Sequence, residues 1–344
     1  MENFWLICLF TLSLISTRAI DSTVAAVPVT AAQVLAPLEL VEQVPMPRVA
    51  GRIDHITADI KRHRLFVSAL GNDTVEVVDY SIGKWIYSIT GLNQPKGILY
   101  VGDFGELFVV NKGDGTLKIY DDSYNVLKAI DIGTHVDYLH YDPKSKKVLV
   151  AFSQGTIRNV GGIAIIDPAT NQREGTIATD GPPEDFAIEA SGSRIFANIY
   201  DTSLVESIDR KTGQLTKWQL NNALKPVPMA LNEADHRLFV ISRIPPVMLV
   251  LDTETGKEIA RMPVGGISAD LFFDPSKKRI YIVNGAGFIS VFQQKDLDHF
   301  DLIDTVHTTV GARSGYFHEA FHRLFIAAPA KGDGPALVLE YQTP

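Results

Sequence analysis

The order of apolar and polar residues between Ile53 and Thr90 predicts four short β-strands. Short apolar runs are separated there by turns that contain Gly, Asn, Asp and Ser, and apolar and polar residues nearly alternate within Thr74–Asp79. Runs of about four to eight residues bounded by such turns are typical of antiparallel strands. The same layout recurs to the end of the chain.

A second-strand signature, a charged residue followed by aliphatic and aromatic residues, marks each repeat. Successive copies begin 41 to 47 residues apart. A period of roughly 40 to 50 residues with four strands per unit is typical of propeller blades. The sequence therefore predicts an all-β fold, a single seven-bladed β-propeller. The seven signatures are Arg64–Val67, Glu106–Val109, Lys147–Val150, Arg194–Phe196, Arg237–Val240, Arg279–Ile282 and Arg323–Ile326.

The two ends of the repeat array predict how the ring closes. The last unit reaches its third strand at Ala336–Tyr341 and has no fourth. The segment Pro37–Pro47 resembles Lys257–Val264, the outer strand of the fifth unit. We therefore expect the N-terminal strand to complete the last blade, which removes the unpaired sheet edges.

The N-terminus predicts export to the periplasm or out of the cell. Phe4–Ile15 is largely apolar, and the small residues Thr17 and Ala19 follow at the usual positions before a cleavage site. The run is shorter than the roughly 20 residues of a membrane span, so we expect no stable membrane insertion. The expected segments are a signal peptide at 1–19, a flexible leader at 20–36 and the propeller at 37–344.

Composition narrows the expected partners. Apolar residues make up 46% of the chain and charged residues 21%, as in ordinary folded soluble proteins. A formal net charge of -8 argues against a phosphate-binding surface, so we expect no nucleic acid partner. The only cysteine, Cys8, lies in the predicted signal peptide, which leaves no thiol in the mature chain. We expect a monomer that binds a protein or a small polar ligand.

The turns indicate which face of the disc binds. Turns between strands one and two, and between three and four, carry generic Asp, Lys, Arg and Gly chemistry and share one face. The loops between strands two and three lie on the opposite face and vary, from Gly71–Asp73 to Ala330–Pro335. Varied loops on a rigid scaffold are where binding residues concentrate. We expect the binding site on that face and at the channel mouth.

Short motifs within the repeats resemble a known family. They are Leu65–Val67 with Asn72, Thr74–Asp79 with Gly83–Lys84, Ile280–Asn284, and Val250–Asp252 with Thr255–Lys257. The pattern resembles the YVTN-type (YncE-like) propeller repeat over residues 37–344. The resemblance implies an exported binding protein. Related seven-bladed folds include lactonases that hydrolyse phosphogluconolactone and the copper-bearing domain of nitrous oxide reductase, so the fold alone does not decide the function.

Two consecutive positions near the start of each innermost strand are the candidates for channel-lining residues. Because side chains alternate along a strand, we expect one of these rings to face the channel and the other a neighbouring blade. The first ring is Asp54, Lys96, Asp137, Glu184, Val227, Ala269 and Arg313, and the second is His55, Gly97, Tyr138, Asp185, Pro228, Asp270 and Ser314.

Each ring predicts a different chemistry. If the first faces inward, its charged members Asp54, Lys96, Asp137, Glu184 and Arg313 either neutralise one another or bind a small polar ligand. If the second faces inward, it brings three residues together that could hold a divalent metal or activate water, or that simply line a wet channel. These three are His55, Asp185 and Asp270.

Familiar catalytic sequences do not occur in the chain. It contains no Gly-x-Ser-x-Gly elbow, no phosphate-binding loop and no His-Glu-x-x-His motif. No cofactor is expected, although a divalent metal stays open as an alternative. We therefore expect a binding or scaffolding module rather than an enzyme. The alternative is a small-molecule hydrolase of the lactonase type that uses the three residues of the second ring.

Overall fold

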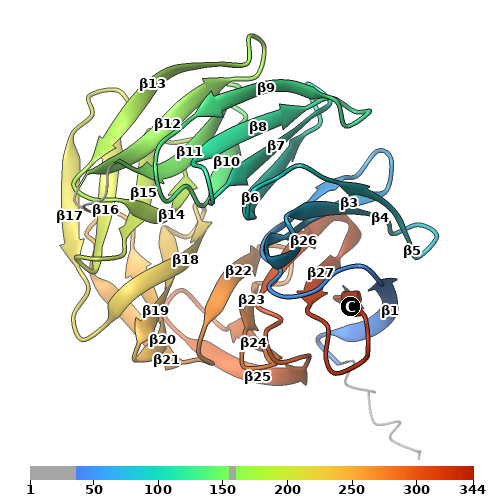
Figure 1. The fold of residues 1–344 in the computed structure, drawn as a ribbon. Coiled ribbons are helices and arrows are strands. Elements are labelled where there is room, and N and C mark those ends of the chain that lie inside the picture. Colours follow the sequence, from blue (N-terminus) through green and yellow to red (C-terminus); the bar gives the residue numbers. More distant parts are fainter. Residues whose placement is uncertain (1–35, 155–159) are drawn as a thin grey trace, which may run out of the picture. The chain divides into compact units, whose positions relative to one another are not determined.

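A computed structural model describes residues 36–154 and 160–344. The predicted signal peptide, and the predicted leader up to residue 35, lie outside the described residues, so export stays a prediction. Residues Ala36–Pro344 form one compact unit. Its described strands make seven four-stranded antiparallel sheets around one axis (Figure 1). The predicted seven-bladed propeller is confirmed.

Each blade runs from an innermost strand beside the axis to an outermost strand at the rim. Seven innermost strands surround the axis: β2 (Ile56–Asp59), β6 (Pro95–Val101), β10 (Leu139–Asp142), β14 (Pro183–Ile188), β18 (Leu224–Asn232), β22 (Ser268–Asp274) and β26 (Ser314–His318). The second strands begin where the seven signatures begin: β3 (Arg64–Ala69), β7 (Glu106–Asn111), β11 (Lys147–Ser153), β15 (Arg194–Ile199), β19 (Arg237–Ile244), β23 (Arg279–Asn284) and β27 (Arg323–Ala328).

The outer half of each blade is made by a third and a fourth strand. The third strands are β4 (Thr74–Asp79), β8 (Thr116–Tyr120), β12 (Gly161–Asp167), β16 (Leu204–Asp209), β20 (Pro246–Asp252), β24 (Phe288–Gln294) and β28 (Ala336–Gln342). The fourth are β5 (Lys84–Ile89), β9 (Val126–Asp131), β13 (Gln172–Thr179), β17 (Leu215–Gln219), β21 (Glu258–Pro263), β25 (Phe300–His307) and β1 (Glu39–Met46). Two short 3-10 turns, η1 (Leu70–Asn72) and η2 (Glu319–Phe321), are the only helical elements in the described residues.

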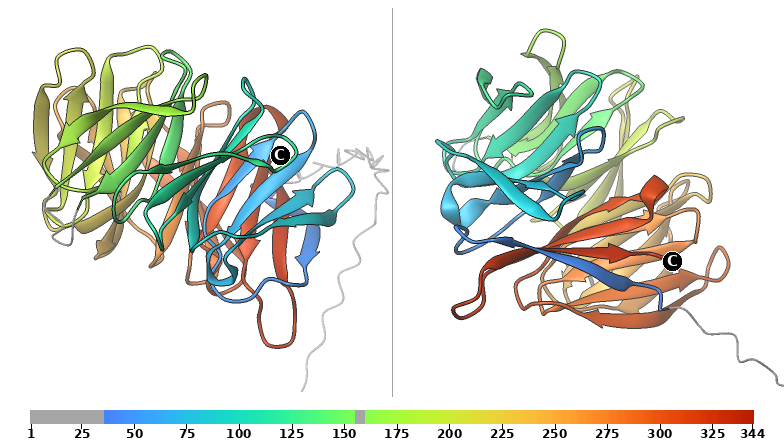
Figure 2. Two further views of the ribbon diagram at one scale, coloured as in Figure 1. Left: turned by 45° about the horizontal axis from the view of Figure 1, so that its top comes forward. Right: turned by 90° about the vertical axis from the view of Figure 1, so that its right-hand side faces the viewer.

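The N-terminal strand closes the ring as the sequence predicts. β1 pairs antiparallel with β28, with Val44 opposite Val338 and Met46 opposite Ala336. Both β1 side chains are buried, so the closing strand contributes to the core as well as to the sheet. Figures 1 and 2 show the blue first strand beside the red last strands.

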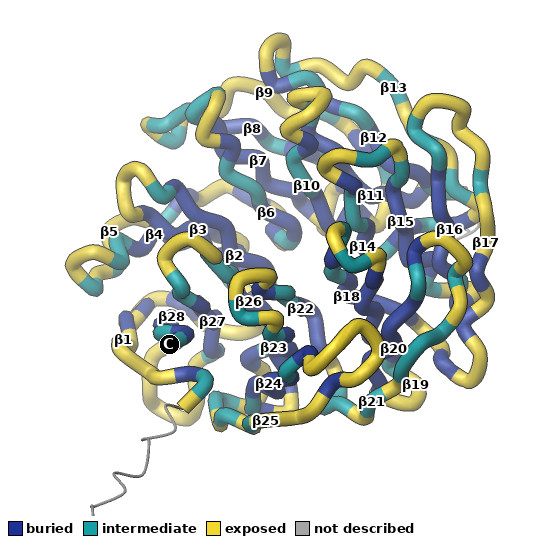
Figure 3. Tube along the Cα trace, turned by 180° about the vertical axis from the view of Figure 1, so that it is seen from behind, coloured by how far each residue is buried: buried dark blue, intermediate teal, exposed yellow. Residues whose placement is uncertain are grey.

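The core lies between neighbouring blades. Second and third strands are almost wholly buried, whereas outermost strands are half exposed (Figure 3). One cluster joins Phe66 and Val77 of the first blade to Leu107 and Val109 of the second. This explains why strand two gave the clearest repeat: its side chains pack against a blade on both faces. Within the described residues, no helix is long and apolar enough to span a membrane.

The innermost strands begin with an irregularity that decides which side chains reach the channel. The Asp54 N–H donates to the Ser68 carbonyl (2.8 Å), while the Ser68 N–H donates to the carbonyl of His55 (3.0 Å). Asp137 and Tyr138 oppose Ala151 in the same way. Two residues opposite one is the geometry of a β-bulge, which interrupts strict alternation. The register also shifts between Pro95 and Ile98, Pro183 and Phe186, Pro226 and Met229, and Ser268 and Asp270.

Candidate functional site

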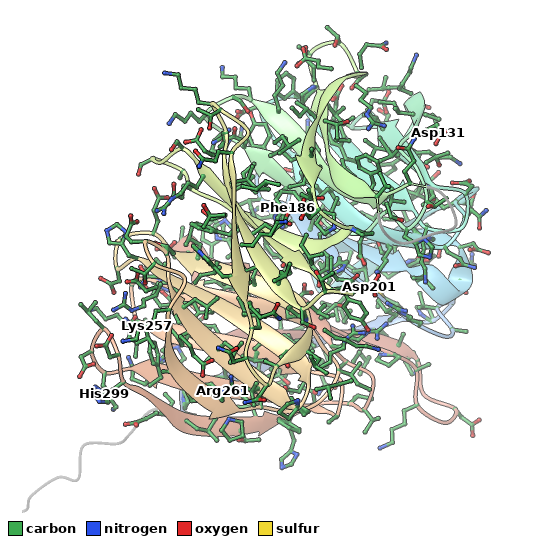
Figure 4. The ribbon with its side chains drawn as sticks, turned by 90° about the vertical axis from the view of Figure 1, so that its left-hand side faces the viewer. Asp131, Phe186, Asp201, Lys257, Arg261 and His299 are labelled. Atoms are coloured by element: carbon green, nitrogen blue, oxygen red, sulfur yellow. The ribbon has the colours of Figure 1, made fainter. Side chains whose placement is uncertain are left out.

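The channel opens, on the face that carries the loops between second and third strands, into a cavity of about 190 Å³, here called the mouth cavity. The turn between β15 and β16 contributes Asp201, which is labelled in Figure 4. Four of the five predicted ligand-binding residues line the cavity, and the fifth, Asp54, is buried beside them. The lining includes the cations Arg52, Lys96, Lys112, Arg243 and Arg313 and the carboxylates Asp137, Glu184 and Asp201.

Part of this charge is neutralised within the first ring. Lys96 forms an ion pair with Asp137, and Asp54 lies against both Arg52 and Arg313, with 3.8 Å to the latter. Burial disfavours the charge of the lysine, but Asp137, Glu184 and Asp54 outweigh burial and raise the pKa of its ammonium. Of the two alternatives that the sequence leaves open for this ring, mutual neutralisation is seen for Lys96 with Asp137 and for Asp54 with Arg313, and ligand binding by the ring stays a prediction.

Two other cations of the mouth cavity have no such counter-charge among the described residues. Lys112, just after β7, forms no ion pair there, and its pKa is lowered by desolvation and then by repulsion from Lys96 and Arg52. The Arg243 guanidinium stands 5.6 Å over the ring of Tyr200 and reaches the phenol oxygen at 3.5 Å. Its buried Nε has no hydrogen-bond partner in the described part of the chain. Among the described residues, Lys112 and Arg243 are thus lining cations without an ion pair, although Glu184 and Asp201 line the same cavity.

Below the mouth, His55 occupies the axis of the channel. Its Nδ1 donates to Asp270 Oδ1 at 3.1 Å, and its Nε2 lies 3.4 Å from Asp54 Oδ1 and 3.9 Å from Asp137 Oδ1. Burial opposes the charged ring, but Asp270, Asp137 and Asp54 outweigh it and raise the pKa of the imidazole well above its usual value. The surrounding carboxylates thus favour the protonated ring of His55, which links blades one, three and six.

Tyr138 closes the remaining width of the channel. Its ring lies 4.3 Å from the His55 ring, and its hydroxyl donates across the channel to the carbonyl of Ala269 in blade six. Burial and the nearby carboxylates raise the pKa of this phenol well above its usual value, so it stays a neutral donor. We call His55, Tyr138, Asp54, Asp137 and Asp270 the plug.

The plug corrects the expectation that only one ring faces the channel. First-ring residues line the mouth cavity, and second-ring residues line a second cavity of about 260 Å³ below the plug. His55 touches Asp54 from the first ring and Asp270 from the second. The bulges at the strand starts are the physical reason, because they turn two consecutive side chains toward the axis.

The three residues of the predicted metal or hydrolase site all line the second cavity, but they are paired with different partners. Asp270 bonds His55, but Asp185 accepts from Nε2 of His140 at 2.9 Å. Nowhere in residues 36–154 and 160–344 do three His, Cys, Asp or Glu side chains group as a metal site. A divalent metal at His55, Asp185 and Asp270 thus stays a prediction without geometric support among the described residues.

Several site residues escaped the sequence analysis. Lys112, Arg243 and Tyr200 lie in or beside the variable loops, where no repeat position marks them. His140 lies two residues after Tyr138, on the same side of the strand. Extending the ring alignment by one further level would have found it, since that level supplies Thr57, Leu99, His140, Phe272 and Tyr316 to the second cavity.

Comparison with known proteins adds the fold and no family. No protein-family model and no curated protein matches this sequence. Among solved structures, the chain is similar to one titled Kuenenia stuttgartiensis Hydrazine Synthase (TM-score 0.73, 18% identity, covering 86% of this chain and 96% of that one). It is also similar to a chain of a structure titled Mitotic Checkpoint Complex (TM-score 0.73, 12% identity, covering 99% of each). At these identities the likeness shows the propeller fold, which is compatible with a binding or scaffolding module.

Proposed function

We propose that the protein is a binding module that takes a small anionic ligand, a carboxylate or a phosphate, in the mouth cavity. The observation that carries the proposal is the pair Lys112 and Arg243, cations without a counter-charge among the described residues. Like charges that line one cavity repel one another, and an anion bound beside them relieves that repulsion. An arginine fork and a lysine ammonium are the donors that carboxylates and phosphates prefer.

The cavity suits a ligand of modest size. Its lining is mostly polar, and Tyr200 holds the Arg243 guanidinium by stacking, so the fork is ordered before the ligand arrives. Preorganised donors lose less entropy on binding. Lys96 is already paired with Asp137 in the cavity wall. Lys112 and Arg243 form no ion pair with a described residue, so their N–H groups are the donors available to a ligand.

The hydrolase alternative has less support from the geometry. A general base needs a lone pair, and an imidazolium such as His55 has none to offer. Its two ring nitrogens already face carboxylates, and its side chain is only 9% exposed. Membership of the YVTN-type family and export agree with a binding role and stay predictions.

Isothermal titration calorimetry with succinate, citrate and inorganic phosphate tests the proposal. At least one should bind the wild type, and Lys112→Met and Arg243→Met should each weaken it about tenfold or more, since a hydrogen bond to a charged group is lost. Lys257→Met is the matched control, because Lys257 is exposed in a turn on the opposite face and forms no ion pair with a described residue (Figure 4). Equal binding by all three variants, or no binding by the wild type, would overturn the proposal.

A further inference from the structure

The second cavity has a chemistry of its own. Its volume is about 260 Å³, and most of its lining is apolar, with Leu99, Met229 and Phe272 among the walls. The plug stands between the second cavity and the mouth cavity. Two pairs of charged residues line the second cavity, His55 with Asp270 and His140 with Asp185. A concave, largely apolar site with a few placed polar groups is the usual form of a small-molecule pocket.

Asp185 fixes the tautomer of His140. Asp185 Oδ1 accepts from the Phe186 N–H at 2.8 Å and from His140 Nε2 at 2.9 Å, while Oδ2 accepts from the Met229 N–H at 3.0 Å. Burial raises the pKa of Asp185, and these donors oppose that effect. Since both oxygens already accept hydrogen bonds, the proton belongs on His140 Nε2. In the tautomer that carries its proton on Nε2, Nδ1 is an acceptor.

The ring of His140 is held in place while Nδ1 stays available. Phe186, labelled in Figure 4, packs edge-on against it with 4.7 Å between ring centres. The side chain is 40% exposed and lines the cavity, and Nδ1 makes no hydrogen bond to a described residue. His140 Nδ1 is therefore an oriented acceptor in a mostly apolar wall that also includes the polar side chains of Thr57, Asp270 and Tyr316.

We propose that the second cavity is a separate binding site for a small, mostly apolar molecule with one hydrogen-bond donor, such as a phenol or an indole, which donates to His140 Nδ1. This site takes a neutral ligand, whereas the mouth cavity takes an anion. It is independent of the mouth proposal, because the two cavities share neither donors nor ligand charge.

Phenol and anisole are the compounds that test this site. They differ in the donating hydrogen, which a methyl group replaces in anisole. At about pH 8, above the range in which histidine ordinarily protonates, phenol should bind more tightly than anisole. Phenol should also shift the ¹⁵N resonance of His140 Nδ1 without shifting that of the exposed His299.

Two variants separate binding from folding. His140→Phe keeps the ring and loses the acceptor, so phenol should bind about tenfold more weakly while anisole is unchanged. His299→Gln should change neither. Phenol that binds no better than anisole, or that leaves the His140 Nδ1 resonance of the wild type unmoved, would overturn the proposal even if His140→Phe failed to fold.

Discussion

The mouth and the plug both contain cationic side chains and carboxylates, and they differ in how these charges are paired. In the plug, His55 faces carboxylates at both ring nitrogens and is almost fully buried. At the mouth, Lys112 is exposed and has no carboxylate partner in the described residues. In the described residues, His55 of the plug is therefore paired with carboxylates, although its Nε2 and Asp137 Oδ1 make no hydrogen bond there. Lys112 at the mouth has no ion pair in those residues.

This difference separates structural charge from functional charge. The two charges of a buried ion pair neutralise each other in the folded protein. Removing one partner therefore lowers stability, and we expect no direct effect on ligand affinity. An uncompensated surface cation costs the fold little, so removing it harms binding alone. Stability and binding measurements on the two regions should therefore give opposite patterns.

The largest expected effect is at the plug. Asp270→Ala leaves the imidazolium of His55 without its closest partner, so we expect a loss of about 3–5 kcal/mol in the free energy of unfolding, measured with urea. Asp296→Ala is the matched control, because Asp296 and His299 form a similar pair at the surface, 60% and 77% exposed. That exposed pair should contribute little to stability, because water and salt screen it. Equal losses from the two variants would contradict the contrast.

Next comes the packing beside the plug. A Cβ on Gly97 would meet the Asp137 carbonyl oxygen at 1.9 Å, whereas a Cβ on Gly266, in a blade crossing on the mouth face, would meet nothing within 4 Å. Gly97→Ala should therefore lower the free energy of unfolding by about 1–3 kcal/mol or more. Gly266→Ala should change it by less than about 0.5 kcal/mol. If Gly97→Ala leaves the free energy of unfolding unchanged, the backbone beside the plug is not packed as tightly as the structure shows.

A pH series sharpens the comparison further. The folded-state pKa of His55 is raised, so its contribution is full below its ordinary value of 6.5 and is lost as pH rises through the raised value. The pKa of Asp137 is lowered by Lys96 and His55 against burial, so its contribution is full above 3.8 and is lost as pH falls. The plug should stabilise most between those values.

His55→Gln isolates the histidine part of this effect. The stability gap between wild type and variant should be widest below about pH 6.5 and narrow above it by at most about 1.4 kcal/mol per pH unit. Urea unfolding at a series of pH values measures the gap. A gap that widens as pH rises would mean that His55 is neutral in the folded protein.

The smallest expected stability effect is at the mouth. Lys112 sits among like charges that lower its pKa, so Lys112→Met should leave the melting temperature unchanged or raise it slightly. The same variant should lose anion binding. A variant that melts well below the wild type would place Lys112 in a structural ion pair instead.

The sequence was sufficient to predict the fold, but not the contacts between side chains in the channel. Repeat spacing predicted seven blades, and the likeness of Pro37–Pro47 to a fourth strand predicted the closure by β1. The repeat period reveals the number of blades because each blade packs against its neighbours in the same way and so needs the same pattern of apolar residues. The channel residues belong to different blades, so no local spacing relates His55 to Asp270. Strict alternation failed there because the bulges are set by backbone pairing, which residue types did not reveal.

The binding residues in the loops were even harder to predict from the sequence. The part of the loops in binding was expected, but Lys112 and Arg243 became candidates only because the structure places no ion-pair partner beside them among the described residues. His140 and Asp185 lie 45 residues apart and meet only in three dimensions. Charge compensation is a property of neighbours in space, which a repeat alignment does not supply.

The most direct test of the central claim is the pKa of Lys112 itself, measured by NMR on ¹³C-labelled lysine side chains with and without succinate. The account predicts a pKa below the usual range in the free protein, because partial desolvation and the charges of Lys96 and Arg52 disfavour the ammonium. Bound succinate should raise it, while the side-chain ¹³C resonances of Lys257 should not respond to succinate. An ordinary pKa that succinate leaves unchanged would contradict the claim that the mouth is an anion site.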